Sequence, residues 1–206
     1  MDSNLSQLFT IMESIKNTSS RKGKEDIIRE NKNNELFTKT LVFLLDSSIV
    51  TGINKSKIAK EKNLGVSEFI NTLSDCMDYL VENNTGKDID MSNVQKFIND
   101  NTEYAQFIRD VVTKSYKLGA DTKVVNSVIP NLIVTWEVQL GTSIDNCKLK
   151  GDEVLTISQK CNGCRASFHK GKLISRQGKV FVGLDHIIND INKLGFKNYF
   201  IDGELI

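Results

Sequence analysis

Lys160-Cys161-Asn162-Gly163-Cys164-Arg165 is the stretch from which the second half of this chain can be interpreted. An Asn-Gly pair between apolar-flanked segments is typical of a two-residue β-hairpin turn. With Asn162 and Gly163 in such a turn, Lys160 and Arg165 become cross-strand partners with Cβ atoms about 5 Å apart. Two cations so placed repel each other, whereas an anion bound between them would make the electrostatic energy favourable. The sequence therefore predicts a phosphate-binding hairpin with an amine beside it. A solvated basic hairpin is the alternative.

The residues around this stretch predict a small antiparallel sheet with one helix. Short runs rich in apolar and β-forming residues, separated by Asn-Gly and Lys-Gly turns, predict strands at 154–160, 165–168, 173–176 and 199–205. A stripe at helical spacing predicts one helix, formed by Leu184, Ile187, Ile188, Ile191 and Leu194. Gly195 is well placed to end that helix.

The first 140 residues predict helices. Apolar residues recur at helical spacing from Leu5 to Ile15, from Leu36 to Leu44 and from Phe69 to Leu80. Ser92 and Asn101-Thr102 fit the starts of two further helices, and Pro130 would end another that runs through Val124–Ile129. Residues 131–136 look extended. We therefore predict an α+β protein with a helical domain at 1–140, a linker at 141–150 and a β-rich domain at 151–206.

Composition sets limits on location and partners. The chain has 206 residues, 39% of them hydrophobic, which suffices for a packed core. No apolar run approaches the roughly 18 to 20 residues that span a bilayer, and no signal-peptide pattern is present, so we expect a cytoplasmic protein without a membrane partner. Four unevenly spaced cysteines predict reduced thiols. Residues 1–140 carry 17 basic and 19 acidic side chains, so any DNA-binding basic residues must gather on one face.

Three motifs resemble those of a known superfamily. Lys160-x-Asn162-Gly163-x-Arg165 resembles the Lys-x-Asp-Gly-x-Arg motif of the covalent nucleotidyltransferases. Ser175-Arg176-Gln177-Gly178 resembles the Ser-Arg-x-Gly element that follows it in DNA ligases, and Phe200-Ile201-Asp202-Gly203-Glu204 resembles the third element. Residues 118–130 resemble the end of the helical DNA-binding domain of phage-type and eukaryotic ATP-dependent DNA ligases, which capping enzymes lack. The resemblance covers residues 85–206 by motif and the earlier residues by general character.

This resemblance implies a ligase reaction and assigns roles to four residues. Lys160 would attack the α-phosphorus of ATP and hold AMP, which then passes to the 5′-phosphate of a nick in double-stranded DNA during replication, repair or recombination. A free lysine is almost wholly protonated at neutral pH, so neighbouring cations or desolvation must favour its neutral form. Arg165 and Arg176 would contact the ribose and phosphate side of the nucleotide. Glu204 would bind ribose or help hold Mg²⁺, and we expect a monomer.

Two departures from the family pattern limit this expectation. Asn162 stands where most of the superfamily has Asp, which removes a negative charge near Lys160 but keeps a turn-forming side chain. The chain also stops at Ile206, before the elements that supply an adenine-stacking aromatic, a second carboxylate and phosphate-binding lysines in the family. We therefore expect that this polypeptide does not complete ligation, and we hypothesise a ligase fragment or truncated product. Robust labelling of Lys160 by ATP would contradict that hypothesis.

Three other functions stay open. Cys161-x-x-Cys164, with His169 and Cys147, invites a zinc or redox site, but a second close cysteine pair is missing. The helical domain alone could be a DNA- or protein-binding module beside an inactive second domain. An RNA ligase-like nucleotidyltransferase shares the lysine motif, although the helical leader favours DNA.

Overall fold

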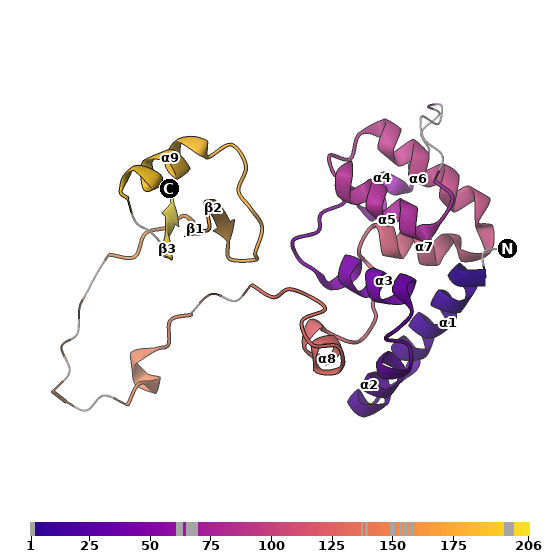
Figure 1. The fold of residues 1–206 in the computed structure, drawn as a ribbon, viewed down its shortest axis with the longest axis horizontal. Coiled ribbons are helices and arrows are strands. Elements are labelled where there is room, and N and C mark those ends of the chain that lie inside the picture. The colour runs from indigo at the N-terminus through magenta and orange to yellow at the C-terminus, as the bar shows by residue number, and fades with distance from the viewer. Residues whose placement is uncertain are drawn as a thin grey trace. The chain divides into compact units, whose positions relative to one another are not determined.

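The chain forms two compact units, Met1–Thr135 and Trp136–Ile206. The first is helical and the second contains a sheet, so the predicted α+β fold is confirmed (Figure 1). The computed structural model describes residues 3–60, 64, 70–136, 138, 140–148, 151–152, 154, 156, 159–195 and 200–206. Within this described part, every helix is too short or too polar to traverse a lipid bilayer.

Helices make up the first unit. They are α1 (Ser3–Asn17), α2 (Arg21–Glu30), α3 (Glu35–Leu45), α4 (Lys55–Ile58), α5 (Leu73–Glu82), α6 (Asp88–Asp100), the short 3₁₀ turn η1 (Thr102–Tyr104), α7 (Ala105–Val112) and α8 (Thr122–Val128). The predicted apolar stripes become the core: Leu5, Leu8, Met12 and Ile15 of α1 are fully buried. Each such side chain contributes about 1.5–3 kcal/mol relative to exposure. Phe69, predicted to lead into α5, lies outside the described residues.

Polar side chains fix where several of these helices begin. Ser20 caps α2 by accepting from the backbone N–H of Gly23 (3.1 Å), and Asn34 caps α3 by accepting from that of Phe37 (3.0 Å). Thr72 and Asp75 form a reciprocal capping box at α5. These bonds satisfy backbone N–H groups that have no partner inside the helix.

Ser92 is not a helix cap, contrary to the sequence-based prediction. Helix α6 begins four residues earlier, at Asp88, because the Asp90 carboxylate accepts from the backbone N–H of Lys87 (3.2 Å). Ser92 is buried within the helix and donates to the carbonyl of Leu64 (2.7 Å). The acidic residues of the first turn, favoured at the positive end of a helix dipole, were the better signal.

The segment after Pro130 is not extended as predicted. Asn131 has a positive φ of 60°, and residues 131–136 form no strand. The Asn126 side chain explains this, because it donates to the carbonyl of Ile133 (2.9 Å) and accepts from its N–H (3.0 Å). This pair of bonds folds the segment back onto α8, which ends at Val128 as the proline indicated.

The second unit is a three-stranded antiparallel sheet with one helix. Its elements are the 3₁₀ turn η2 (Ile144–Asn146), strands β1 (Cys164–His169) and β2 (Lys172–Ser175), helix α9 (Asp185–Lys193) and strand β3 (Ile201–Leu205). The strand order is β2-β1-β3 (Figure 1). Gly195, with φ of 72°, follows the predicted helix. Part of the predicted 154–160 strand lies outside the described residues, and its described residues are not in a strand.

The predicted hairpin at Asn162-Gly163 is wrong. The hairpin turn of this sheet is Lys170-Gly171, where both residues have positive φ (48° and 76°), as a two-residue type I′ turn requires. Lys160 is therefore not the cross-strand partner of Arg165. That partner is Glu204 on β3. The start of β1 pairs with β3, so it cannot pair with the residues before Asn162. The chain instead turns at Lys170-Gly171, where β1 pairs with β2.

Candidate functional site

One face of the sheet gathers the motif residues. Side chains alternate between faces along a strand, and directly paired residues share a face. Arg165 and Ser167 of β1 pair with Glu204 and Asp202 of β3, so these four side chains lie on the same face. The opposite face carries Ala166, Phe168 and Leu173 and forms, with Ile187 and Ile191 of α9, an apolar pocket of about 160 Å³. We call the face with Arg165, Ser167, Asp202 and Glu204 the chemical face of the sheet. The other face packs against α9.

Arg165 is held side-on by Asp202. Its Nε lies 3.1 and 3.0 Å from the two carboxylate oxygens, and its Nη2 lies 2.6 Å from Oδ2. The hydroxyl of Ser167, which is 1% exposed, donates to Asp202 Oδ1 (3.0 Å). The hydrogen bond from Arg165 holds the pKa of Asp202 below its usual value, and Asp202 in turn raises the pKa of Arg165. The guanidinium is therefore fixed in direction and always charged.

The Lys160 loop approaches the end of β3 through Gly163. A Cβ atom at Gly163 would lie 2.2 Å from the carbonyl oxygen of Leu205 and 3.5 Å from Glu204 Oε2. Only glycine permits this approach, which explains Gly163 without a hairpin. Lys160 is exposed, and its Nζ donates to Asn162 Oδ1 (3.2 Å). The loop thus meets the end of β3 at Gly163, three residues after Lys160.

Arg176 lies in a tight turn that follows β2. Within Ser175–Gly178, the N–H of Gly178 donates to the carbonyl of Ser175 (2.9 Å), and the Ser175 hydroxyl accepts from the N–H of Lys179 (3.1 Å). Ser175 pairs with Ala166, the residue after Arg165, so the turn begins beside Arg165. Of the four residues singled out from the sequence, the register brings Arg165 and Glu204 together. It places Arg176 at the adjacent strand end and Lys160 on the neighbouring loop.

Sequence reasoning missed several side chains on this face. The motif resemblance includes Asp202 but assigns it no role, and Ser167 lies in a predicted strand without a predicted role. The period-2 alternation Arg165, Ser167, His169 could have indicated a shared face. The sequence places Phe200 in a predicted strand and Trp136 in a segment predicted to be extended, but no spacing rule connects either residue to His169. The three rings nevertheless cluster, with centroids 6.0 to 6.2 Å apart.

Known proteins offer a comparison for the fold. No protein-family model matches this chain, and no curated protein sequence matches it. Two solved structures, named Pmar-Lig_PreS3 and Pmar-Lig_Pre, are similar to it with a TM-score of 0.61 each. Their sequence identities to this chain are 20% and 22%, and each alignment covers 97% of this chain and 50% of the solved chain. The fold is ligase-like.

The ligase-like fold extends over both units, since the alignments cover nearly all of this chain. The chain spans about half the length of the solved structures it matches. At these identities the likeness concerns the backbone arrangement alone. Roles of individual residues therefore depend on the geometry of the sheet face.

The cysteines do not converge on a metal site. Cys147, Cys161 and Cys164 are exposed free thiols, whereas Cys76 is buried. In the described ranges, no group of three or more His, Cys, Asp or Glu side chains is arranged to hold a metal ion. The two thiols of Cys161-x-x-Cys164 both face solvent, on either side of the Gly163 contact with β3.

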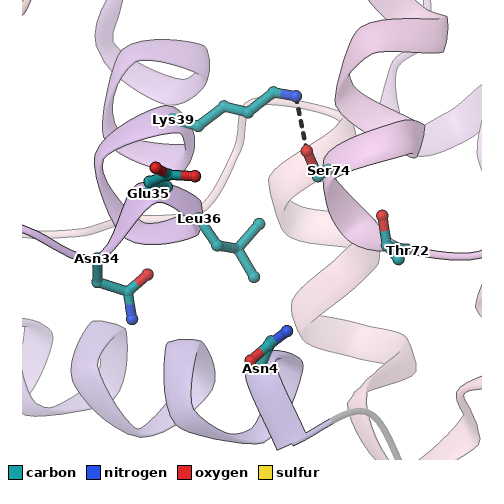
Figure 2. Close-up of a pocket in the computed structure, with 7 residues that line it drawn as sticks. All are labelled: Asn4, Asn34, Glu35, Leu36, Lys39, Thr72 and Ser74. Atoms are coloured by element: carbon teal, nitrogen blue, oxygen red, sulfur yellow. Dashed lines mark hydrogen bonds between the residues drawn. The ribbon is translucent and has the colours of Figure 1, made fainter.

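The first unit has a polar pocket of its own. Its volume is about 590 Å³, and it is lined by Asn4, Asn34, Glu35, Leu36, Lys39, Thr72 and Ser74 (Figure 2). Figure 2 shows Lys39 reaching across to Ser74, to which its Nζ donates (2.7 Å). Lys39 also pairs with Asp78 (2.5 Å). These contacts tie α3 to α5, so a structural role accounts for the lysine.

Proposed function

We propose that this chain belongs to an ATP-dependent DNA ligase and that its second unit carries the lysine that accepts AMP. The observation that supports this most directly is the sheet face on which Arg165, Asp202 and Glu204 meet beside the Lys160 loop. Arg165 and Asp202 lie 37 residues apart in sequence, yet both belong to motifs that resemble those of nucleotidyltransferases. The ligase-like fold is consistent with this proposal.

The proposed chemistry begins with nucleophilic attack by Lys160. The lone pair of its neutral amine forms a bond to the α-phosphorus of ATP, the bond from that phosphorus to pyrophosphate breaks, and the amine proton passes to solvent. An oxygen of the 5′-phosphate at a nick then attacks the phosphorus of the bound AMP, and the P–N bond breaks to return the lysine amine. The 3′-hydroxyl finally attacks the 5′-phosphate, loses its proton to solvent and expels AMP. Arg165 would contribute a directed, permanently charged donor to the nucleotide, because Asp202 fixes its orientation.

Glu204 is the carboxylate on this face that suits Mg²⁺. Asp202 is already committed to Arg165 and Ser167, whereas the Glu204 carboxylate has no hydrogen bond or ion pair within the described part of the chain. Mg²⁺ commonly binds through one or two carboxylates plus substrate phosphates. When bound, it would neutralise charge on the departing pyrophosphate. Glu204 and the phosphates of ATP would hold it.

The helical unit would bind the nicked duplex. Its compact core, independent of the second unit, fits the proposed DNA-binding domain at residues 1–140. Ion pairs already neutralise several of its basic side chains, including Lys39, Lys55 and Lys96. We therefore expect modest affinity that falls with rising salt.

ATP binding and covalent labelling test the proposal separately. We expect saturable, Mg²⁺-dependent ATP binding that weakens on Arg165→Ala and on Glu204→Gln. Lys193→Gln is the matched control, because Lys193 is an exposed lysine on α9 paired with Asp190. With radiolabelled ATP, label on Lys160 would support the ligase chemistry and contradict the fragment hypothesis. A lack of both binding and label would overturn the proposed function, and label on another lysine would overturn the role of Lys160.

A second candidate is a DNA-binding module without AMP transfer. The separate core of the helical unit favours it. Binding to a nicked duplex without ATP binding or label would support this candidate. Competition between nicked DNA and nicked RNA would distinguish an RNA ligase-like protein.

A further inference from the structure

The chemical face of the sheet continues past Asp202 to an aromatic end. On β1, His169 lies four residues beyond Arg165, roughly 13 Å along the strand. Phe168 pairs with Ile201, so Phe200 enters β3 at the level of His169. The rings of His169 and Phe200 have centroids 6.2 Å apart. The same face thus changes from a charged end at Arg165 to an aromatic end at His169.

Trp136 completes this aromatic end, and the fold makes room for it. Its ring lies 6.0 Å from that of His169 and 6.1 Å from that of Phe200. A Cβ atom at Gly178, whose φ is +82°, would lie 2.9 Å from the Cβ of Trp136. Trp136 therefore packs against the turn that carries Arg176. We call Trp136, His169 and Phe200 the aromatic platform.

Two features show that the platform is not simply a small core. Phe200 remains 52% exposed, although it is one of the largest apolar side chains of this unit. The indole Nε1 of Trp136 is buried and has no hydrogen-bond partner among the described residues. A buried donor without an acceptor costs about 1–3 kcal/mol, so most folds avoid it. Within the described part of this unit, the platform leaves Phe200 half exposed and Trp136 Nε1 without an acceptor.

Cations flank the platform at the tip of the β1–β2 hairpin. Lys172 pairs directly with His169, and Lys170 lies in the turn between them. Both lysines are exposed, and neither has an ion-pair partner among the residues that the structure describes. Exposed aromatic rings beside exposed cations are the chemistry by which sheet surfaces bind unpaired bases and their phosphates.

We propose that the aromatic platform binds an unpaired base of a nucleic-acid strand, with Lys170 and Lys172 on the adjoining phosphates. The base stacks on the exposed ring of Phe200, whose centroid lies 6.1 Å from that of Trp136 and 6.2 Å from that of His169. This site goes beyond the proposed function, because AMP transfer to Lys160 does not require it. It would hold a strand end or a frayed base on the sheet face that carries Arg165 and Glu204.

The fluorescence of Trp136, the only tryptophan in the chain, tests this directly. A single-stranded oligothymidylate of about 12 nucleotides, a length that such sites span, should quench its emission. An abasic oligomer of the same length and charge should leave the emission unchanged. Equal quenching by both oligomers would overturn the proposal without any variant. DNA bound by the helical unit alone would not produce the quenching, because that unit has no tryptophan.

Variants sharpen the test. Phe200→Ala should weaken oligothymidylate binding roughly 5- to 150-fold, the range for loss of one stacked base. Phe200→Leu keeps apolar bulk without an aromatic ring, so full affinity in that variant would contradict stacking. Lys172→Gln should reduce the salt dependence of binding by about one phosphate contact, whereas Lys193→Gln should not. The Trp136 emission and the urea midpoint of each variant are first measured without ligand and must match those of the original chain. Binding affinities are then compared.

Free AMP separates this site from the nucleotide site. AMP and the oligomer are compared at equal concentrations of bases. If AMP quenches the Trp136 emission to the same extent as the oligomer, the platform is a cofactor site and the strand assignment is wrong. Lys160→Ala should retain oligothymidylate quenching. Normal ATP binding with no quenching by oligothymidylate would overturn this inference and leave the proposed function intact.

Discussion

Gly163→Ala should break the connection between the Lys160 loop and β3. The new Cβ would lie 2.2 Å from the Leu205 carbonyl oxygen and 2.9 Å from its carbon, far inside contact distance. Backbone atoms cannot rotate away as a flexible side chain can, so the Cys164–Leu205 pair must separate. Overpacking costs about 1–3 kcal/mol and a lost ladder hydrogen bond about 1 kcal/mol, which gives about 2–4 kcal/mol.

That cost is large for the second unit. A single small core of this size rarely supplies more than about 3–5 kcal/mol, so we expect β3 to detach or the unit to unfold in very low urea. Urea titration followed by Trp136 emission measures this, because the only tryptophan lies in that unit. Far-ultraviolet circular dichroism, dominated by the helical first unit, should change little.

Gly203→Ala is the matched control. A Cβ at Gly203 meets no atom within 4 Å, and Gly203 sits in the same β1–β3 ladder. We expect the free energy of unfolding of this variant to lie within about 0.5 kcal/mol of that of the original chain. An unchanged midpoint in Gly163→Ala would refute the close approach. Equal losses in both variants would show that glycine flexibility, not contact with Leu205, matters.

Four further outcomes follow from burial and charge. Phe37→Ala removes a fully buried side chain of α3 and should cost about 3–5 kcal/mol in the thermal unfolding of the first unit. A thiol reagent should modify the three exposed cysteines quickly in the native protein, and Cys76 only after unfolding. Burial raises the pKa of Cys76 to about 12, so its contribution to stability should be lost as pH rises from about 9 towards 12, and Cys76→Ala should flatten this alkaline decline. Because Arg165 lowers the pKa of Asp202, stability from that carboxylate is present above its unfolded pKa and lost as pH falls through the lowered value. When the urea midpoint is measured by Trp136 emission at decreasing pH, Asp202→Asn should reduce the loss of stability at acid pH.

Local patterns in the sequence predicted the helices well and the hairpin poorly. The stripe from Leu5 to Ile15 specifies α1 because its contacts repeat within one helix. Asn162-Gly163 carries an equally local turn signal, but its structure is decided by Leu205, a residue about forty positions away. Lys170-Gly171, a weaker turn signal because lysine disfavours positive φ, forms the turn since both flanking strands pair.

The site could be predicted in residue identity but not in arrangement. Motif resemblance singled out Arg165 and Glu204, and the β1–β3 register places them directly opposite each other. It did not indicate that Asp202 would bind Arg165, because that contact depends on which strand lies at the centre of the sheet. The aromatic platform had no signal at all, since Trp136 and Phe200 are brought together by tertiary packing.

The strand order β2-β1-β3 also fixes the sequence in which this unit can assemble. The β1–β2 hairpin closes a two-residue turn and can form early, whereas β3 must find β1 across a separation of 37 residues between Asp202 and Arg165. Closing that longer loop carries the larger entropic cost, so we expect β3 to dock last and to be lost first. Arg165 therefore acquires its fixed direction only at the final folding step. Any ligand that bridges β1 and β3 would bind the fully folded state alone and would shift the folding equilibrium towards it.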